Sequence, residues 1–189
     1  DYQLASGLSQ DVETDDSVLR QTSARLPWLL IGMLGGIGNS MILGNFDTTF
    51  AAHPEMALYI PLIGGTGGNV GTQSSALVVQ GLANSSLDAN NTWKQILKES
   101  VVALINATII SMLVYIYNFI RFGATATVSY SVSLSLFAVV MFASIFGTLV
   151  PMTLEKLKID PAIATGPFIS ITNDIIGMML YMGITVLLS

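Results

Sequence analysis

The sequence predicts an all-α, polytopic membrane protein with five transmembrane helices, and three observations lead to this fold class. Only 10% of the 189 residues are charged and 52% are hydrophobic, whereas soluble domains carry about 25% charged residues. Several stretches without any charged side chain exceed the roughly 20 apolar residues that a membrane-spanning helix needs. These stretches also lack the short alternating pattern of barrel strands, so helices are favoured.

The uncharged stretches place the five helices along the chain. Residues 26–46 and 100–120 carry no charge, and two longer uncharged stretches cover residues 56–87 and 122–154. The final stretch, from Pro161 to Ser189, is interrupted only by Asp174. We therefore predict transmembrane helices over about 26–46, 56–82, 100–120, 130–155 and 161–188.

The polar residues gather before the first predicted helix. Asp11, Glu13, Asp15 and Asp16 carry much of the formal net charge of −5, and such a run is typical of a solvated segment. Nothing in residues 1–24 could form a hydrophobic core of its own. We interpret residues 1–24 as a cytoplasmic linker and residues 25–189 as one transmembrane domain.

The basic residues predict how the chain is oriented in a plasma membrane. If the N-terminus is cytoplasmic, the outer loops hold Arg121 alone among the seven basic residues. Cytoplasmic loops are enriched in Lys and Arg, so the chain is expected to have its N-terminus in the cytoplasm and its C-terminus outside. The inner segments would then hold Arg20, Arg25, Lys94, Lys98, Lys156 and Lys158.

Composition argues against several other kinds of protein. The few basic residues form no tract, so no nucleic-acid partner is expected. The chain has no cysteine and a single histidine, His53, which argues against thiolate and His-based metal sites. No catalytic set accompanies Asp174, so we do not expect an enzyme. Glu55, Glu99 and Glu155 flank the ends of predicted helices, where solvated or capping roles are favoured.

The second predicted helix has an unusual composition for a segment that faces lipid. Residues 61–75 contain five glycines together with amide and hydroxyl side chains. The spacings Gly64/Gly68 and Gly67/Gly71 would suit close helix packing, and that alternative stays open. The amides exceed what packing needs, so we favour an aqueous path lined by this helix. The candidate pore-lining residues here are Gly65, Gly68, Asn69, Thr72 and Gln73.

The fifth predicted helix carries an acidic residue near its middle. A carboxylate at membrane depth costs at least ~2.5 kcal/mol, so Asp174 is a functional candidate. No Lys or Arg lies within any predicted helix, so a buried ion pair has no basic partner there. Helical spacing places Gly166, Ser170 and Gly177 on the same stripe as Asp174, and this stripe would suit a pore wall.

The charge of the site indicates how many chains it needs. One carboxylate cannot balance a divalent cation, whereas two copies of Asp174 around a shared axis would supply a charge of −2. If the ion is divalent, the sequence favours a homodimer with a pore at or near its interface. Mg2+ usually keeps several of its waters, and oxygen ligands spaced to hold those waters would select it.

These two helices resemble the MgtE family of magnesium channels. The similar segments are Pro61-x-x-Gly64-Gly65-Thr66-Gly67-Gly68-Asn69-x-Gly71-x-Gln73-Ser74, Asp160-Pro161-Ala162, and Asn173-Asp174-x-x-Gly177, with Arg25-Leu26-Pro27-Trp28 before the first helix. The resemblance covers about residues 20–189. It implies a homodimeric channel whose pore is lined chiefly by the second and fifth helices.

The resemblance also implies roles for particular residues. Asp174 would be the intramembrane selectivity carboxylate, and Asp160 would match a position that binds Mg2+ at the cytoplasmic mouth. Some relatives have Asn at the position of Gly166. Gly166 has no side-chain amide, so a pore contact made by that Asn would be absent here. Asn173, within the matched segment, joins the candidate pore-lining residues. Full-length relatives carry cytoplasmic Mg2+-sensing domains upstream, and residues 11–24 would be the end of the connecting helix.

Together these observations predict a channel that conducts hydrated Mg2+ down its electrochemical gradient. The metal-site candidates are Asp174 and Asp160, with Mg2+ as the permeant and bound ion. An H+- or Na+-coupled divalent cation exchanger is the alternative, because it would also use an intramembrane Asp and distorted helices.

Overall fold

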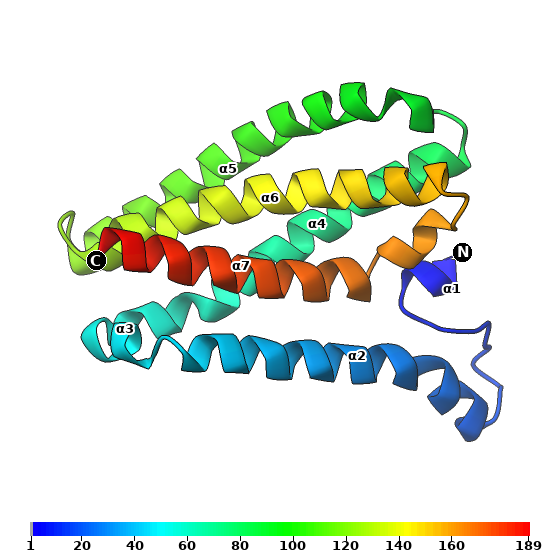
Figure 1. Ribbon diagram of the computed structural model, residues 1–189, viewed down its shortest axis with the longest axis horizontal. Helices are drawn as coiled ribbons and strands as arrows, with labels where there is room; N and C mark the ends of the chain where they lie inside the picture. Colours follow the sequence, from blue (N-terminus) through cyan, green and yellow to red (C-terminus); the bar gives the residue numbers. More distant parts are fainter. Residues whose placement is uncertain (1) are drawn as a thin grey trace.

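The computed structural model describes residues 2–189, and five long helices dominate this range. They are α2 (Val18–Gly44), α4 (Ile60–Ala83), α5 (Thr92–Phe122), α6 (Thr127–Lys156) and α7 (Pro167–Leu188). Successive long helices run in opposite directions, so the two ends of the chain lie at opposite ends of the bundle (Figure 1). The prediction of an all-α polytopic membrane protein is confirmed.

Shorter elements connect the long helices. They are α1 (Tyr2–Ala5), α3 (Asp47–Ala52) and three 3-10 helices, η1 (Pro54–Tyr59), η2 (Ala89–Asn91) and η3 (Pro161–Ala164). The connections after α4 and α6 lie at the same end of the bundle as α1, and the opposite end holds α3 and the C-terminus (Figure 1).

Among the described residues, four helical segments are long and apolar enough to cross a membrane. They are Val18–Gly44, Ala89–Phe122, Thr127–Lys156 and Pro161–Leu188. The helix α4 is not among them, because its glycines, amides and hydroxyls lower its hydropathy. Its 24 residues nevertheless span about 36 Å at 1.5 Å per residue. The fifth crossing therefore follows from the length and place of α4 in the bundle.

The helix ends differ from the limits of the uncharged stretches. The helix α2 begins at Val18, where the Ser17 side chain accepts a hydrogen bond from the Arg20 backbone N–H, so the predicted boundary between residues 24 and 25 lies inside a helix. The predicted helix 56–82 is divided into η1 and α4, and the predicted helix 161–188 into η3 and α7. An uncharged stretch marks the thickness of the membrane, whereas caps and glycines decide where a helix ends.

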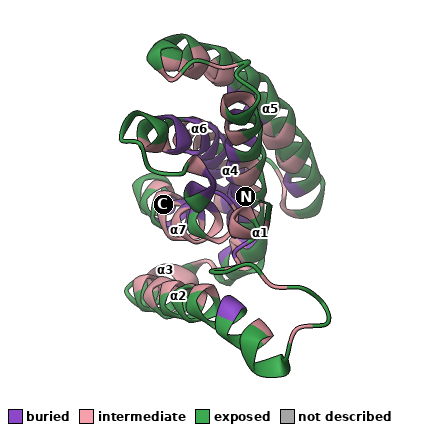
Figure 2. Ribbon diagram, turned by 90° about the vertical axis from the view of Figure 1, so that its right-hand side faces the viewer, coloured by how far each residue is buried: buried purple, intermediate pink, exposed green. Residues whose placement is uncertain are grey.

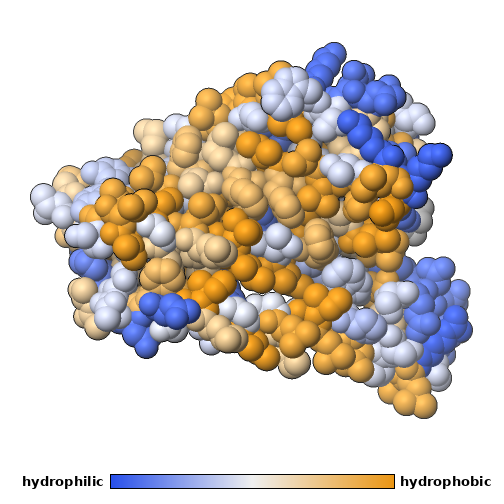
Figure 3. Space-filling model, viewed as in Figure 1, coloured by the Kyte–Doolittle hydropathy of each residue, from blue (hydrophilic) through white to orange (hydrophobic). Residues whose placement is uncertain are grey.

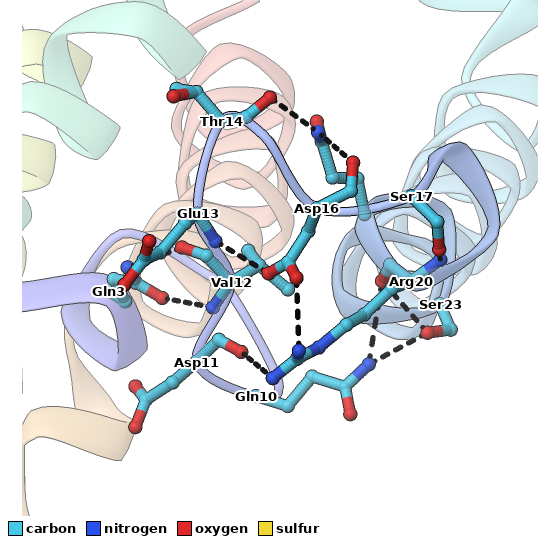
Figure 4. A network of polar contacts seen from close by, with 11 residues as sticks. Gln3, Gln10, Asp11, Val12, Glu13, Thr14, Asp16, Ser17, Arg20 and Ser23 are labelled. Atoms are coloured by element: carbon cyan, nitrogen blue, oxygen red, sulfur yellow. Dashed lines mark hydrogen bonds and ion pairs between the residues drawn. The ribbon is translucent and has the colours of Figure 1, made fainter.

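The segment before α2 is held by a polar network rather than by a core. The Arg20 side chain forms an ion pair with Asp16 (Nη1 to Oδ1, 2.9 Å) and donates to the Asp11 carbonyl. The Gln3 side chain donates a hydrogen bond to the Val12 carbonyl through Nε2 and accepts one from the Val12 backbone N–H through Oε1 (Figure 4). Part of the acidic run is thus used to fold this segment, and residues 8–17 form no helix.

The core of the bundle lies around α6. This helix packs against α4, α5 and α7, and Figure 2 shows it largely buried. Apolar side chains from four segments meet there, including Ile63, Leu136, Val139 and Met178. In the C-terminal half of α7, Tyr181 Oη donates to the Met56 carbonyl over 2.7 Å. This bond ties η1, which leads into α4, to α7.

The helices α2 and α5 form the outer faces of the bundle. The helix α2 packs mainly against α7 and lies below the other helices in Figure 1. Its outer side chains are apolar and exposed, as are those of α5, and hydrophobic surface dominates the middle of the molecule in Figure 3. Such a surface suits a lipid environment.

Candidate functional site

Asp174 lies on α7, where that helix crosses α4. The side chain is half-buried, and it lies against the backbone of Gly64, because a Cβ on Gly64 would be 2.8 Å from Asp174 Oδ1. Within residues 2–189 the Asp174 carboxylate has no hydrogen bond and no ion pair. The ion pair found there joins Arg20 to Asp16, and His53 Nδ1 lies 3.6 Å from Glu55 Oε1. The described part of the chain thus supplies no hydrogen-bonding or basic partner to this carboxylate.

Two other glycines of α4, Gly68 and Gly71, receive side chains of α7 in the same manner. A Cβ on Gly68 would be 3.0 Å from Ser170 Oγ, and one on Gly71 would be 2.0 Å from Asn173 Nδ2. The close-packing interpretation therefore accounts for these glycines. It also sets the distance between α4 and α7, because any larger residue would push Ser170 or Asn173 away from α4.

A second face of α4 points away from the rest of the chain. Gly65, Asn69 and Gln73 are exposed and repeat every four residues, and Thr72 beside them is half-buried. A Cβ on Gly65 would meet nothing within 4 Å. Exposed amides on a membrane-spanning helix are costly against lipid, so this polar face calls for water or a polar partner.

Two predicted pore-lining residues lie in the interior of the single chain. Asn173 is 1% exposed, and neither its Oδ1 nor its Nδ2 has a hydrogen-bond partner within the described part of the chain. Gly177 is buried beside Val139 and Ile63. Both residues lie where α4, α6 and α7 meet. They therefore contribute to the packing that sets how α4 and α7 cross near Asp174.

The predicted stripe on α7 is interrupted at Gly166. This residue caps α7 with φ +53° and ψ −119°, a conformation that favours glycine. A Cβ on Gly166 would lie 2.3 Å from the Ala5 carbonyl oxygen, so the turn after α1 lies directly against it. Ser170 is half-buried one turn further along.

Asp160 belongs to a different part of the structure from Asp174. Its side chain is exposed, and Oδ1 accepts a hydrogen bond from the Ala162 backbone N–H over 2.9 Å, which caps η3. No group of three or more His, Asp or Glu side chains comes together within the described residues. In one chain, then, the two metal-site candidates remain separate.

The sequence reasoning missed two polar contributors near α4. Glu99 on α5 accepts a 2.6 Å hydrogen bond from Ser74 on α4, although a solvated or capping role was expected for it. No sequence signal links two residues on separate helices in this way. Gln80 is also exposed and lies seven residues after Gln73, so helical spacing alone could have added it to the polar face.

Comparison with known proteins gives these residues a family context. A family model described as a divalent cation transporter, MgtE, matches residues 60–184, which include α4 and nearly all of α7. The chain is 32% identical over 184 residues to the magnesium transporter MgtE of Bacillus subtilis. It is 33% identical over 165 residues to that of Thermus thermophilus and 29% identical over 184 residues to that of Enterococcus faecalis.

The similarity covers most of this chain but a minor part of each relative. The three alignments cover 97%, 87% and 97% of this chain and 41%, 36% and 40% of the respective relatives. The chain thus spans about two fifths of the length of these relatives. The relatives are transporters by name, in agreement with the prediction that the chain is not an enzyme.

Proposed function

Because this chain belongs to the MgtE family of divalent cation transporters, we propose that it forms a channel that conducts hydrated Mg2+ through the membrane. The related proteins from Bacillus subtilis and Thermus thermophilus are named magnesium transporters. The chain supplies helices that suit the transmembrane part of such a protein, and the ion is its substrate.

The observation that carries the proposal is the environment of the Asp174 side chain. Its carboxylate is half-buried on a membrane-spanning helix and has no basic partner within the described residues. An ionised carboxylate at this depth is stabilised by a cation or by water. A permeating cation therefore accounts for its presence better than a structural role does.

The neighbouring polar groups suit an ion that keeps its hydration shell. Mg2+ loses its waters reluctantly and is usually bound through one or two carboxylates with several waters in place. In the proposed site Asp174 accepts hydrogen bonds from those waters, and Asn69, Gln73 and Thr72 offer further oxygen atoms on α4. Ser170 lines the proposed ion path on the side of α7. Gly65, on α4, has no side chain that would narrow this path.

A second copy of the chain completes the proposed pore. One Asp174 supplies a single negative charge, whereas two copies match the charge of Mg2+. The polar face of α4 is unpartnered in one chain, and a twofold-related α4 would let two such faces enclose water. We propose a homodimer on this basis. Gly68, Asn173, Gly177 and Gly166 stay predictions as pore contacts, because helix packing or the N-terminal turn covers them in one chain.

The remaining parts of the proposal concern the two ends of the pore. Asp160 would bind a second Mg2+ at the cytoplasmic mouth, next to upstream Mg2+-sensing domains in the full-length protein. The protein would lie in the plasma membrane with its N-terminus in the cytoplasm and its C-terminus outside. An inside-negative potential of 100 mV would favour entry of a divalent ion by about 4.6 kcal/mol, twice the ~2.3 kcal/mol per charge. A passive pore would then suffice for uptake.

A flux measurement tests the proposal. The intact protein is reconstituted in liposomes, and uptake of Mg2+, Ca2+ and Mn2+ is compared at fixed voltage. We expect Mg2+ uptake to follow the voltage and to be independent of H+ and Na+ gradients. Uptake that requires one of those gradients would instead establish the coupled exchanger, and the absence of Mg2+ uptake would contradict both.

A further inference from the structure

A groove separates α2 from α7 at the end of the bundle that holds α1. Its volume is about 710 Å3, and residues 6–8 form one side of it. Leu29 and Gly32 of α2 and Ile171 of α7 form apolar walls.

The groove contains one charged side chain, that of Arg25. Arg25 is exposed and donates to Gln21 Oε1 over 3.3 Å. In the described part of the chain no carboxylate lies within 4 Å of its guanidinium. Arg20, five residues earlier on the same helix, is instead paired with Asp16 (Figure 4). The groove thus carries a positive charge that the chain itself does not neutralise.

Trp28 lies beside Arg25 in the groove and is half-buried. Tryptophan is enriched where a membrane meets water, and Arg near a helix end extends toward the headgroups. The pair therefore marks the depth at which lipid headgroups lie. From that depth the groove continues toward the middle of the membrane along apolar side chains.

We propose that this groove binds an anionic phospholipid. The Arg25 guanidinium holds the phosphate, because Arg binds phosphate through paired hydrogen bonds. One acyl chain lies along Leu29, Gly32 and Ile171, where Gly32 adds no side chain to the groove. A net negative headgroup is favoured over a zwitterionic one, because the positive charge of Arg25 is otherwise uncompensated.

The bound lipid would join α2 to the rest of the bundle. The helix α2 packs mainly against α7, and its contact there uses small residues: a Cβ on Gly32 would be 3.8 Å from Ile171 Cδ1. A lipid in the groove would fill the remaining space between these two helices. The site thus lies on the side of α7 that faces α2.

The test measures lipid retention by native mass spectrometry. The intact protein, purified in mild detergent, is offered phosphatidylglycerol or phosphatidylcholine with identical acyl chains. We expect preferential retention of phosphatidylglycerol and a loss of about fivefold or more in the Arg25→Gln variant. Lys156→Gln removes one positive charge from an exposed site at the same end of the bundle and should retain the lipid as the unmodified protein does. Equal retention of both lipids, or an equal loss in both variants, overturns the proposal.

Two further experiments identify the ligand in the groove. Gly32→Leu fills the apolar part of the groove and should reduce retention, whereas Gly36→Leu, where a Cβ would meet nothing within 4 Å, should not. Inorganic phosphate at the same concentration should not displace the lipid, and displacement would make free phosphate the ligand instead. If Arg25→Gln changes the oligomeric mass and not the retained lipid, the groove is a contact between two copies, and the proposal is wrong.

Discussion

The Cα atom of Gly64 lies against the carboxylate of Asp174, and a methyl group added to Gly64 would stand 2.8 Å from Oδ1 of that carboxylate. The position of Asp174 therefore depends on the absence of a side chain on the neighbouring helix. This relationship joins the two features that the sequence marks most clearly, the glycine-rich helix and the acidic helix. It also makes the proposed ion site sensitive to very small changes.

Replacing Gly64 with Ala should displace the Asp174 carboxylate. The carboxylate is the far end of a flexible side chain, so the fold should tolerate the shift while the proposed ion site does not. We expect Mg2+ flux to fall about tenfold, which corresponds to about 1.4 kcal/mol. Gly183→Ala on α7 is the control, since a Cβ there meets nothing within 4 Å and the residue has no place in the proposed pore. Equal flux in both variants would show that the contact of Gly64 with Asp174 has no role in conduction.

Removing the charge of Asp174 should abolish conduction. Asp174→Asn keeps the size of the side chain, and Asp174→Ala removes its polar end. Two unit charges 4 Å apart interact by about 4 kcal/mol at an effective dielectric constant of 20, so we expect the flux in liposomes to fall more than tenfold. Size-exclusion chromatography should show an unchanged oligomer. The exposed carboxylate Asp15 provides the comparison: Asp15→Asn should conduct normally. Undiminished flux in both Asp174 variants would remove this residue from the mechanism.

The crossing of α4 and α6 should be intolerant of a single added methyl group. A Cβ on Gly147 would lie 2.5 Å from the backbone oxygen of Gly71, and a backbone atom cannot move as cheaply as a side chain. We expect Gly147→Ala to destabilise the protein by about 1–3 kcal/mol, measured as a lower thermal unfolding temperature in detergent.

Gly183→Ala on α7 is the matched substitution for that experiment, because a Cβ at Gly183 meets nothing within 4 Å. It should leave the unfolding temperature unchanged or raise it slightly, since Ala favours a helix by about 0.5–1 kcal/mol over Gly. If Gly147→Ala behaves as Gly183→Ala does, α4 and α6 lie farther apart in the protein than the structure places them.

The orientation of the chain can be measured with single cysteines, because this chain contains none. Asn90 and Thr125 are exposed in connections at opposite ends of the bundle. In a background without other cysteines, a membrane-impermeant maleimide applied to intact cells should label Thr125→Cys and not Asn90→Cys. The reverse pattern would place the N-terminus outside and contradict the positive-inside argument.

The uncharged stretches predicted the number and order of the long helices, because membrane thickness sets a minimum length that sequence records directly. They did not predict the break at Gly166, since η3 and α7 lie in one apolar stretch. The break depends on a positive φ at Gly166 and on the closeness of the Ala5 carbonyl, which is 161 residues away in sequence. Local patterns carry no information about such a contact.

The sequence by itself predicted an acidic residue, Asp174, within a membrane-spanning stretch and without a basic partner on any predicted helix, because charge and hydropathy are properties of residues and their spacing. Only the tertiary structure decided which face of α4 meets α7. It assigned Gly64, Gly68 and Gly71 to packing and left Gly65, Asn69 and Gln73 exposed. A glycine-rich helix has several faces that a neighbouring helix can approach closely. Which face is used depends on the volumes of the side chains that pack against α4, namely Ser170, Asn173, Asp174 and Val139.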